Sequence, residues 1–585
     1  MKRILKTLFS RMAIVIAALA LQIAWLFVMI LRLGQYYAPL SLGFCLLSVA
    51  VVAWIINARG NPAIKMAWII PIMVFPIFGG VVYLMAGGKK PRRRMRRQIE
   101  SAARKIAVLD KAAQPPPPVL SGPAPALSPS VESPALAAPL SQLPRAVQAV
   151  PDSPRVPDER GLPAAPFAEP PPANAHACPV APPRLPGADV LDEIARLDPR
   201  VAGQCRYLAA QGFAVHRHTR AEYFRLGEEQ FAAMLRELEK AERFIFMEYF
   251  IIEEGRMWDS LLDILRRKAR AGVDVRVIFD DVGCMNTLPF RYDRCLEEQG
   301  IRALAFNPFR PVLSAVMNNR DHRKITVIDG HTGFTGGVNL ADEYINARSK
   351  YGHWKDTGVL LRGEAVWNLT RLFLEMWNAF RPTDESLDAF RPRALPGESF
   401  ADDGFVQPYG DTPLDNEVLA ENVYLNIVNQ ARRSLDIFTP YLVIDHEMTR
   451  ALCLAAGRGV RVRLILPGIH ESRVLKRLAA SHFPELIEGG VEVYEYEPGF
   501  IHAKSFVCDG EIATVGTINM DYRSLYLHFE CGCLFYRSAV VAEIAADMEE
   551  TLSRCRQLRR PQRSRLRGPL RELIDATLRL FAPLM

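Results

Sequence analysis

Two nine-residue stretches of this chain, HRKITVIDG at residues 322–330 and HAKSFVCDG at residues 502–510, share one pattern. Each reads His-x-Lys, then four residues, then Asp-Gly. One such match in a long chain carries little weight, because short patterns arise by chance. Each copy is also followed at the same offset by Gly-x-x-Asn, in GGVN at 336–339 and GTIN at 516–519. The doubled pattern therefore indicates a duplicated functional element.

The segments before each copy are duplicated as well. FIFMEYFII at 244–252 is typical of a buried strand, MWDSLLDILRRKARAG at 257–272 of a helix, and VDVRVIFDD at 273–281 of a second strand. The same succession recurs in SLDIFTPYLVI, EMTRALCLAAGRG and VRVRLILPG between residues 434 and 468. We therefore expect an α/β fold built from two similar halves, at residues 191–400 and 401–560.

The residues of each stretch suit phosphate chemistry. His322 and Lys324 are two positions apart in a β-rich segment, so both should face the same side. The same holds for His502 and Lys504. An imidazole can attack phosphorus while an ammonium group holds the non-bridging oxygens. We predict that these four residues are catalytic.

Further polar residues follow both copies. Glycines let backbone N–H groups approach an anion, and asparagine adds a neutral donor. A carboxylate beside a histidine can fix the tautomer of the ring. The expected sets are phosphate-binding Gly337, Asn339, Gly516 and Asn519; histidine-orienting Asp356 and Glu530; and Asp329 and Asp509, which either orient catalysis or stabilise the turn before a glycine.

Residues 1–90 carry three apolar segments, at about 12–31, 40–56 and 66–86. Each is close to the ~20 residues of a spanning helix, so we expect a membrane anchor with two or three transmembrane helices. A cleaved signal peptide is the alternative for the first segment. Basic runs at the N-terminus and at 89–97 both favour the cytoplasmic side, which places the catalytic part in the cytoplasm.

The remaining segments lack the pattern of a core. Residues 91–190 are basic and then rich in Pro and Ala, which predicts a disordered linker, with a Pro-rich docking ligand as the alternative. Residues 561–585 place Leu570, Leu573, Ile574, Leu578, Phe581 and Leu584 on one helical face. We expect this amphipathic helix either to pack on the catalytic part or to lie in the membrane interface.

The composition limits the classes of partner and cofactor that we expect. The formal net charge of +8 suits anionic partners such as phospholipid headgroups or nucleic acid. The ten cysteines lack metal-ligand spacing, and the close pair Cys531 and Cys533 lies in an apolar run, which favours free thiols. With no nucleotide-binding loop either, we expect no cofactor and no metal.

The two motifs resemble those of the phospholipase D superfamily, whose members place two HxKxxxxD motifs from two similar halves around one active site. The words EYFIIEEG, FDDVG, NNRDHRKI, HWKDTGV and GTINMDYRSLYLHFE narrow the resemblance to bacterial cardiolipin synthases. The apolar N-terminus ending in PIFGGVVYL does the same. The resemblance covers about residues 12–97 and 205–585 and leaves out the Pro/Ala-rich linker.

The resemblance implies an enzyme of the bacterial inner membrane that joins two phosphatidylglycerols and releases glycerol. One histidine would form a phosphatidyl-histidine, and the other would serve as acid and base; we favour His322 as the nucleophile and His502 as the acid and base. Lys324, Lys504, Asn339 and Asn519 would stabilise the charged five-coordinate state. A phospholipase D-type hydrolase is the main alternative, because water and an alcohol can use the same intermediate. Nucleic acid is not expected as a partner, since the apolar segments argue against a nuclease, and the oligomeric state stays open.

Overall fold

The structure is a computed structural model of the chain. It describes residues 38–112 with short gaps (59, 75–78, 81–82, 84–86 and 88–92), then 187–309, 318–383, 385–393, 403–559 and 569–584, and a few positions between 20 and 32. Most of the first apolar segment and residues 113–186 of the expected linker lie outside the described residues.

The first half holds a seven-stranded sheet. Its strands are β1 (Thr219–Phe224), β2 (Phe244–Tyr249), β3 (Asp274–Asp280), β4 (Arg302–Phe306), β5 (Lys324–Ile328), β6 (Thr332–Gly336) and β8 (Gly358–Gly363). They lie in the order β1-β8-β6-β5-β2-β3-β4. The pairs β2–β3 and β3–β4 are parallel, and the other pairs are antiparallel.

The second half repeats this sheet and adds one strand. Its strands are β9 (Phe405–Asp411), β10 (Ser434–Phe438), β12 (Arg461–Pro467), β13 (Glu492–Tyr496), β15 (Ser505–Cys508), β16 (Ile512–Gly516), β18 (Glu530–Tyr536) and β19 (Cys555–Leu558). The order β9-β18-β16-β15-β10-β12-β13-β19 matches the first sheet strand for strand, with β19 at the edge. The expected duplication of an α/β unit is confirmed.

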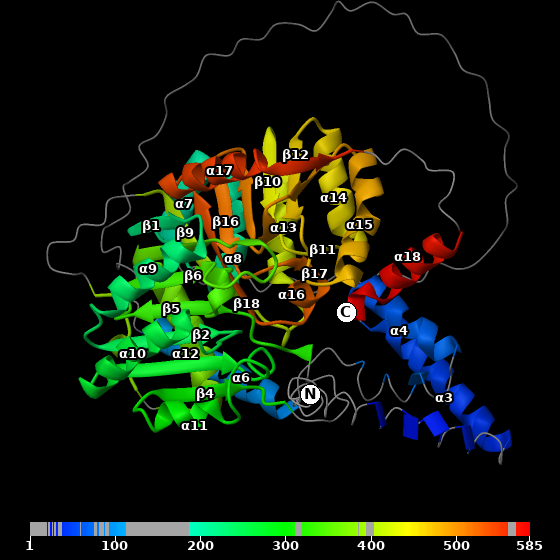
Figure 1. The fold of residues 1–585 in the computed structure, drawn as a ribbon, viewed down its shortest axis with the longest axis horizontal. Coiled ribbons are helices and arrows are strands. Elements are labelled where there is room, and N and C mark those ends of the chain that lie inside the picture. Colours follow the sequence, from blue (N-terminus) through cyan, green and yellow to red (C-terminus); the bar gives the residue numbers. More distant parts are fainter. Residues whose placement is uncertain are drawn as a thin grey trace, which may run out of the picture. The chain divides into compact units, whose positions relative to one another are not determined.

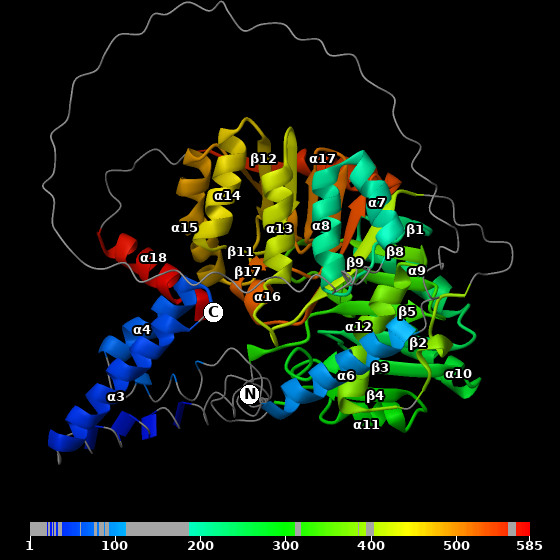
Figure 2. The ribbon, with the colours of Figure 1, turned by 180° about the vertical axis from the view of Figure 1, so that it is seen from behind.

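Helices cover both sheets (Figures 1 and 2). Those of the first half are α9 (Gly227–Leu238), α10 (Arg256–Arg270), α11 (Tyr292–Glu297) and α12 (Val366–Phe380); those of the second are α13 (Leu419–Gln430), α14 (His446–Gly457), α15 (Arg473–Glu488), α16 (Tyr522–Tyr526) and α17 (Ala539–Leu552). Side chains of β2 alternate between two cores. Ile245 and Met247 share one core with α9 and α10, while Phe244 and Phe246 share another with α12. That second core continues through the second half, so the two halves are packed as one body.

Two helices precede β1, and the second of them contacts the second half. These helices are α7 (Ala188–Leu197) and α8 (Pro199–Ala210). Gln407 in β9 donates from Nε2 to the carbonyl oxygens of Cys205, at 3.0 Å, and Phe213, at 2.8 Å. The expected start of the first half stays a prediction.

Part of the expected linker is helical. Residues of α6 (Arg93–Ala112) pack against α12, and Ile99, Ala102 and Ile106 are buried there. These three residues recur at intervals of three and four, which puts them on one face of a helix. The prediction of disorder was wrong for this part, because the many arginines obscured that apolar stripe.

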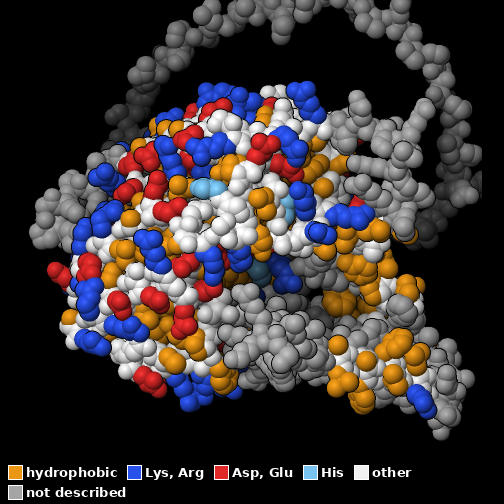
Figure 3. All heavy atoms as spheres, in the orientation of Figure 1, with side chains coloured by type: hydrophobic (Ala, Val, Ile, Leu, Met, Phe, Trp, Pro, Cys, Tyr) orange, Lys and Arg blue, Asp and Glu red, His pale blue; other side chains and the backbone are white. Residues whose placement is uncertain are grey.

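Helix α3 (Ala38–Asn57) contains the second apolar segment, and α4 (Pro62–Val74) contains the start of the third. Large hydrophobic side chains on both helices are exposed, and Figure 3 shows hydrophobic side chains gathered on these helices. Among the residues that the structure describes, we find no helix whose length and apolar content would carry it across a membrane. The expected spanning helices are thus not found in this part of the chain.

The start of α4 is tied to the second half. Asn61 accepts from the backbone N–H of Ala63 at 2.9 Å, which caps the helix. Its Nδ2 donates to Asp445 Oδ2 at 2.8 Å and to Tyr526 Oη at 2.7 Å. Ile64 adds an apolar contact to a small core with the second half and the residues after α18 (Pro569–Phe581). The C-terminal amphipathic helix packs beside α15 and α4, which agrees with the packing alternative.

Asp329 and Asp509 each end the strand that follows a HxK pair. Asp329 accepts three backbone N–H groups, from Glu242, Arg243 and Phe244, at 2.7–2.9 Å. Asp509 accepts the equivalent three at 2.7–3.0 Å. Each aspartate lies seven positions after its histidine, roughly 20 Å along the strand. The contacts correspond to the turn-stabilising alternative.

We predict that Asp509→Ala lowers the free energy of unfolding by about 2 kcal/mol, because backbone donors at the start of β10 lose their acceptor. Urea unfolding of the purified chain measures this. Asp263→Ala is the control, since its side chain is 70% exposed, and it should change stability by less than about 0.5 kcal/mol. Equal unfolding midpoints for the two variants would contradict the stabilising role.

Candidate functional site

Main-chain bonds between the halves place both motif histidines. The N–H of His322 donates to the carbonyl of Phe529 at 2.9 Å, and the N–H of Phe529 donates to the carbonyl of Arg320 at 2.9 Å. On the other side, β14 (Gly499–Ile501) runs parallel to β7 (His353–Lys355). The N–H of His502 donates to the carbonyl of Lys355 at 2.7 Å. Each histidine is thus anchored on the backbone of the opposite half.

The side chains of the two histidines also contact residues of the opposite half. His322 Nδ1 lies 2.9 Å from Glu530 Oε1, and His502 Nδ1 lies 2.6 Å from Asp356 Oδ2. Each histidine is therefore paired with the carboxylate of the other half. A proton on Nδ1 that faces a carboxylate leaves Nε2 as the free ring nitrogen. Both residues expected to orient the histidines lie in hydrogen-bonding contact with them.

The two motif lysines are buried beside the histidines. Lys324 Nζ donates to the carbonyl of His322 at 2.6 Å, and Lys504 Nζ donates to the carbonyl of His502. Lys504 Nζ also lies 2.8 Å from His502 Nδ1. That nitrogen cannot donate to Asp356 and accept from Lys504 at once, and we assign its proton to the Asp356 side because a carboxylate is the stronger acceptor.

Burial sets the protonation of this cluster. It lowers the pKa of both His322 and His502 well below the usual value, and the ammonium groups of Lys324 and Lys504 lower them further. Burial also lowers the pKa of Lys324 to about 8 and that of Lys504 to about 7. It raises the pKa of Asp356 to about 7. Both imidazoles are therefore neutral near pH 7 in the free site, and an anion between the lysines would favour proton uptake.

The residues expected to bind phosphate differ in their contacts. Asn339 is engaged, since its Oδ1 accepts from the N–H of Ile251 at 3.0 Å and its Nδ2 donates to Tyr344 Oη at 2.8 Å. Asn519 Oδ1 is buried and has no hydrogen-bond partner among the described residues. The N–H of Gly337 donates to the Thr357 carbonyl at 2.9 Å.

The N–H of Gly516 likewise donates to a backbone carbonyl, that of Lys504, at 3.3 Å. The two glycine amides are therefore not directed at an anion, contrary to expectation, because β-type main-chain pairing uses them. Gly337 has another reason to be glycine. A Cβ at this position would lie 2.0 Å from Asp356 Oδ1. In the second copy Thr517 takes its place and donates its hydroxyl to Glu530.

Comparison with known proteins now identifies the family. Residues 234–377 and 424–552 match the family model described as cardiolipin synthase, PLD-like domain, and residues 46–88 match one described as phospholipase D-nuclease N-terminal. The chain is 36% identical over 363 residues to cardiolipin synthase 2 of Bacillus anthracis, covering 61% of this chain and 69% of that one. The chain belongs to the bacterial cardiolipin synthases of the phospholipase D superfamily.

The chain is similar to other proteins as well. The chain is 37% identical over 369 residues to the cardiolipin synthase of Geobacillus kaustophilus, covering 61% of this chain and 71% of that one. It is 47% identical over 377 residues to an uncharacterized protein of Streptococcus mutans serotype c, covering 64% and 80%. The crystal structure of phosphatidylserine synthase from Haemophilus influenzae Rd KW20 aligns with a TM-score of 0.48 at 16% identity, over 63% of this chain and 95% of that one.

Two residues of this cardiolipin synthase site were missed from the sequence. His528 packs on His322 with ring centroids 5.6 Å apart, and Trp354 packs on His502 at 5.4 Å, both with an interplanar angle of 44°. Each residue lies two positions before the carboxylate of its half. An aromatic ring at this matched position in both copies could have identified them from the sequence. The two copies differ at this position, because the His528 ring can take up a proton and the Trp354 ring cannot.

His528 also belongs to a group that offers metal-ligand atoms. The ligand atoms of His322, His528 and Glu530 all lie within 4.8 Å of one another. Two of these three residues are already joined by the Nδ1 contact described above. The absence of a metal requirement stays a prediction.

We predict that Gly337→Ala lowers kcat/KM for headgroup release from a phospholipid at least 100-fold, because the added methyl displaces the Asp356 carboxylate from His502. Gly203→Ala is the matched control, since a Cβ there meets no atom within 4 Å, and it should leave the rate unchanged. Normal turnover by a folded Gly337→Ala variant would show that the Asp356 contact is dispensable.

Proposed function

We propose that this chain transfers a phosphatidyl group from one phosphatidylglycerol to another and releases glycerol. The observation that carries the proposal is the pair of crossed histidine–carboxylate contacts beside two buried lysines, within a chain of the cardiolipin synthase family. Such a site offers two imidazoles with free Nε2 atoms and two ammonium groups for one phosphodiester. No ATP is needed, because one diester is exchanged for another.

In the first step His322 Nε2 attacks phosphorus, and the bond from phosphorus to the glycerol headgroup oxygen breaks. A phosphatidyl-histidine forms, and His502 delivers a proton to the departing oxygen. In the second step a hydroxyl of the acceptor phosphatidylglycerol loses its proton to His502 and attacks phosphorus. The bond to His322 breaks, which regenerates the free imidazole and releases cardiolipin.

The pKa directions fit this order. A nucleophilic imidazole must be neutral, which the buried His322 is. The acid must carry a proton, and Asp356 together with the bound diester would supply the negative charge that raises the pKa of His502. Lys324 and Lys504 would balance the charge of the five-coordinate phosphorus, and Asn519 Nδ2 would donate to one of its oxygens.

Asp329 and Asp509 act, in this proposal, as positioning residues. Their carboxylates fix the far ends of β5 and β15 against the neighbouring strands. Because the strands lead directly back to the HxK pairs, these anchors maintain the direction from which both motifs enter the site.

We propose that residues 1–90 hold the enzyme at the bacterial inner membrane, with the catalytic halves on the cytoplasmic side. The support is the row of exposed hydrophobic side chains on α3, among them Leu46, Val49 and Trp54 at 60–63% exposure. Such surface gains free energy when lipid replaces water. The substrates are themselves membrane lipids, so this placement brings site and substrate together.

A phospholipase D-type hydrolase is the second candidate, because water can replace the second lipid at the same intermediate. The family assignment favours transfer. Mass spectrometry of the lipids formed from pure phosphatidylglycerol decides between them: cardiolipin with free glycerol supports transfer, and phosphatidic acid as the sole lipid product supports hydrolysis.

We predict that His322→Ala and His502→Ala each reduce cardiolipin formation by at least about 1,000-fold, and that the double variant is no worse than either single one. Residues that act as one unit show such non-additivity. The measurement is product formation from phosphatidylglycerol in mixed micelles. A single variant with wild-type turnover would contradict the shared two-histidine site.

We predict a bell-shaped dependence of kcat/KM on pH. Rising pH ionises Asp356, whose pKa is about 7, and so increases activity on the acid side. Further rise removes the charge of Lys504, with a pKa of about 7, and of Lys324, with a pKa of about 8, so activity falls on the alkaline side. Lys504→Arg should shift the alkaline fall to higher pH, because an arginine stays charged.

The matched control is Lys240→Arg, a lysine whose side chain is 64% exposed, and it should leave the profile unchanged. An active Lys504→Arg variant with an unshifted alkaline limb would rule out Lys504 as the group that titrates there.

A further inference from the structure

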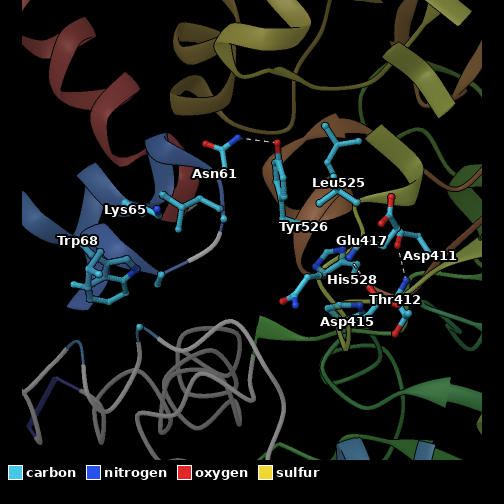
Figure 4. A pocket seen from close by; sticks show the side chains of 18 of the residues that line it. Asn61, Lys65, Trp68, Asp411, Thr412, Asp415, Glu417, Leu525, Tyr526 and His528 are labelled. Atoms are coloured by element: carbon cyan, nitrogen blue, oxygen red, sulfur yellow. Dashed lines mark hydrogen bonds between the residues drawn. The ribbon is translucent and has the colours of Figure 1, made fainter. Parts of the chain in front are cut away.

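A cavity of about 390 Å³ lies between α3, α4 and the second half. Figure 4 shows its two walls: Lys65 and Trp68 come from α4, and Leu525, Tyr526 and His528 face them from the region around α16. The hydrogen bonds from Asn61 to Asp445 and Tyr526 fix the α4 wall relative to the second half. The cavity is therefore a built feature beside the site.

The wall formed by the N-terminal helices is mainly apolar. Trp54, Ile55, Ile64, Trp68 and Tyr83 line it. Trp54 and Trp68 both contact Tyr83 edge to face, at 6.1 and 5.3 Å between ring centroids. Such a wall favours hydrocarbon. The outer surface of α3 is also apolar, so acyl chains can continue from this wall into surrounding lipid.

The opposite wall disfavours an anion. Among the described lining residues the charged groups are the carboxyls of Asp411, Asp415 and Glu417 and the ammonium of Lys65. Burial raises the pKa of Asp411 to about 8, which keeps it neutral near pH 7. The remaining carboxylates outnumber the single ammonium. The phosphate thus belongs between Lys324 and Lys504, and the cavity suits an uncharged group with hydrogen-bond acceptors.

His528 joins the cavity to the catalytic pair. Its side chain is 9% exposed, and its Nε2 has no hydrogen-bond partner among the described residues. Nδ1 lies 3.6 Å from Glu530 Oε1, the same oxygen that pairs with His322. The His528 ring lies against the His322 ring, with centroids 5.6 Å apart, and it also lines the cavity, so the cavity borders the nucleophile.

We infer that this cavity holds the diacylglycerol part of the phosphatidyl donor, with its acyl chains along the wall formed by Trp54, Ile64 and Trp68. The inference rests on the proposed function. In an in-line displacement the nucleophile and the leaving group occupy opposite sides of phosphorus. The diacylglycerol oxygen is then one of the three lateral substituents, so the lipid body extends sideways from His322, where His528 and the cavity lie.

A variant that fills the cavity tests the inference. Ala58→Phe places a ring in the cavity lining and should reduce kcat/KM for the long-chain lipid at least tenfold. It should not alter turnover of bis(p-nitrophenyl) phosphate, a phosphodiester without chains. Equal loss on both substrates, or none on the lipid, would contradict acyl binding here. A wild-type chain that cleaves no phosphatidylglycerol would instead contradict the proposed function.

Discussion

The site depends on one exchange of partners: each motif histidine takes its carboxylate from the other half. Neither half alone completes a histidine–carboxylate pair, since His322 needs Glu530 and His502 needs Asp356. Buried imidazoles and carboxylates without such contacts would carry a large desolvation cost. The exchange therefore demands that the two sheets sit in a fixed relation, which the main-chain bonds at Phe529 and Lys355 and the continuous core maintain.

The two copies are alike in backbone but unequal in chemistry. Gly337 makes room for Asp356, whereas Thr517 at the matching position donates to Glu530. Trp354 covers His502, whereas the ionisable His528 covers His322. A reaction that needs one nucleophile and one acid requires such inequality, because two identical surroundings would give both histidines the same proton affinity. The inequality is consistent with assigning different tasks to His322 and His502.

Much of the fold followed from the sequence, because the doubled HxK pattern lies within doubled strand–helix–strand segments whose periodicity is plain. The proximity of Asp356 and Glu530 to the histidines was also predictable from their matched offsets. The sequence did not predict which carboxylate contacts which histidine. That pairing depends on how the two sheets pack, and a pairing within each half would satisfy the same local pattern. Helix α6 was not predicted, because its many charged residues obscured the apolar stripe. No local sequence pattern indicates that strand pairing uses the amides of Gly337 and Gly516.

The crossed arrangement itself is tested most directly with a phosphatidyl ester of p-nitrophenol, whose leaving group departs without a proton. In the Asp356→Asn variant the acid and base His502 loses its partner while His322 keeps Glu530. We therefore expect a burst of nitrophenolate equal to the enzyme concentration, followed by slow turnover. Glu530→Gln disables the nucleophile and should give no burst. A burst in Glu530→Gln and none in Asp356→Asn would contradict the account.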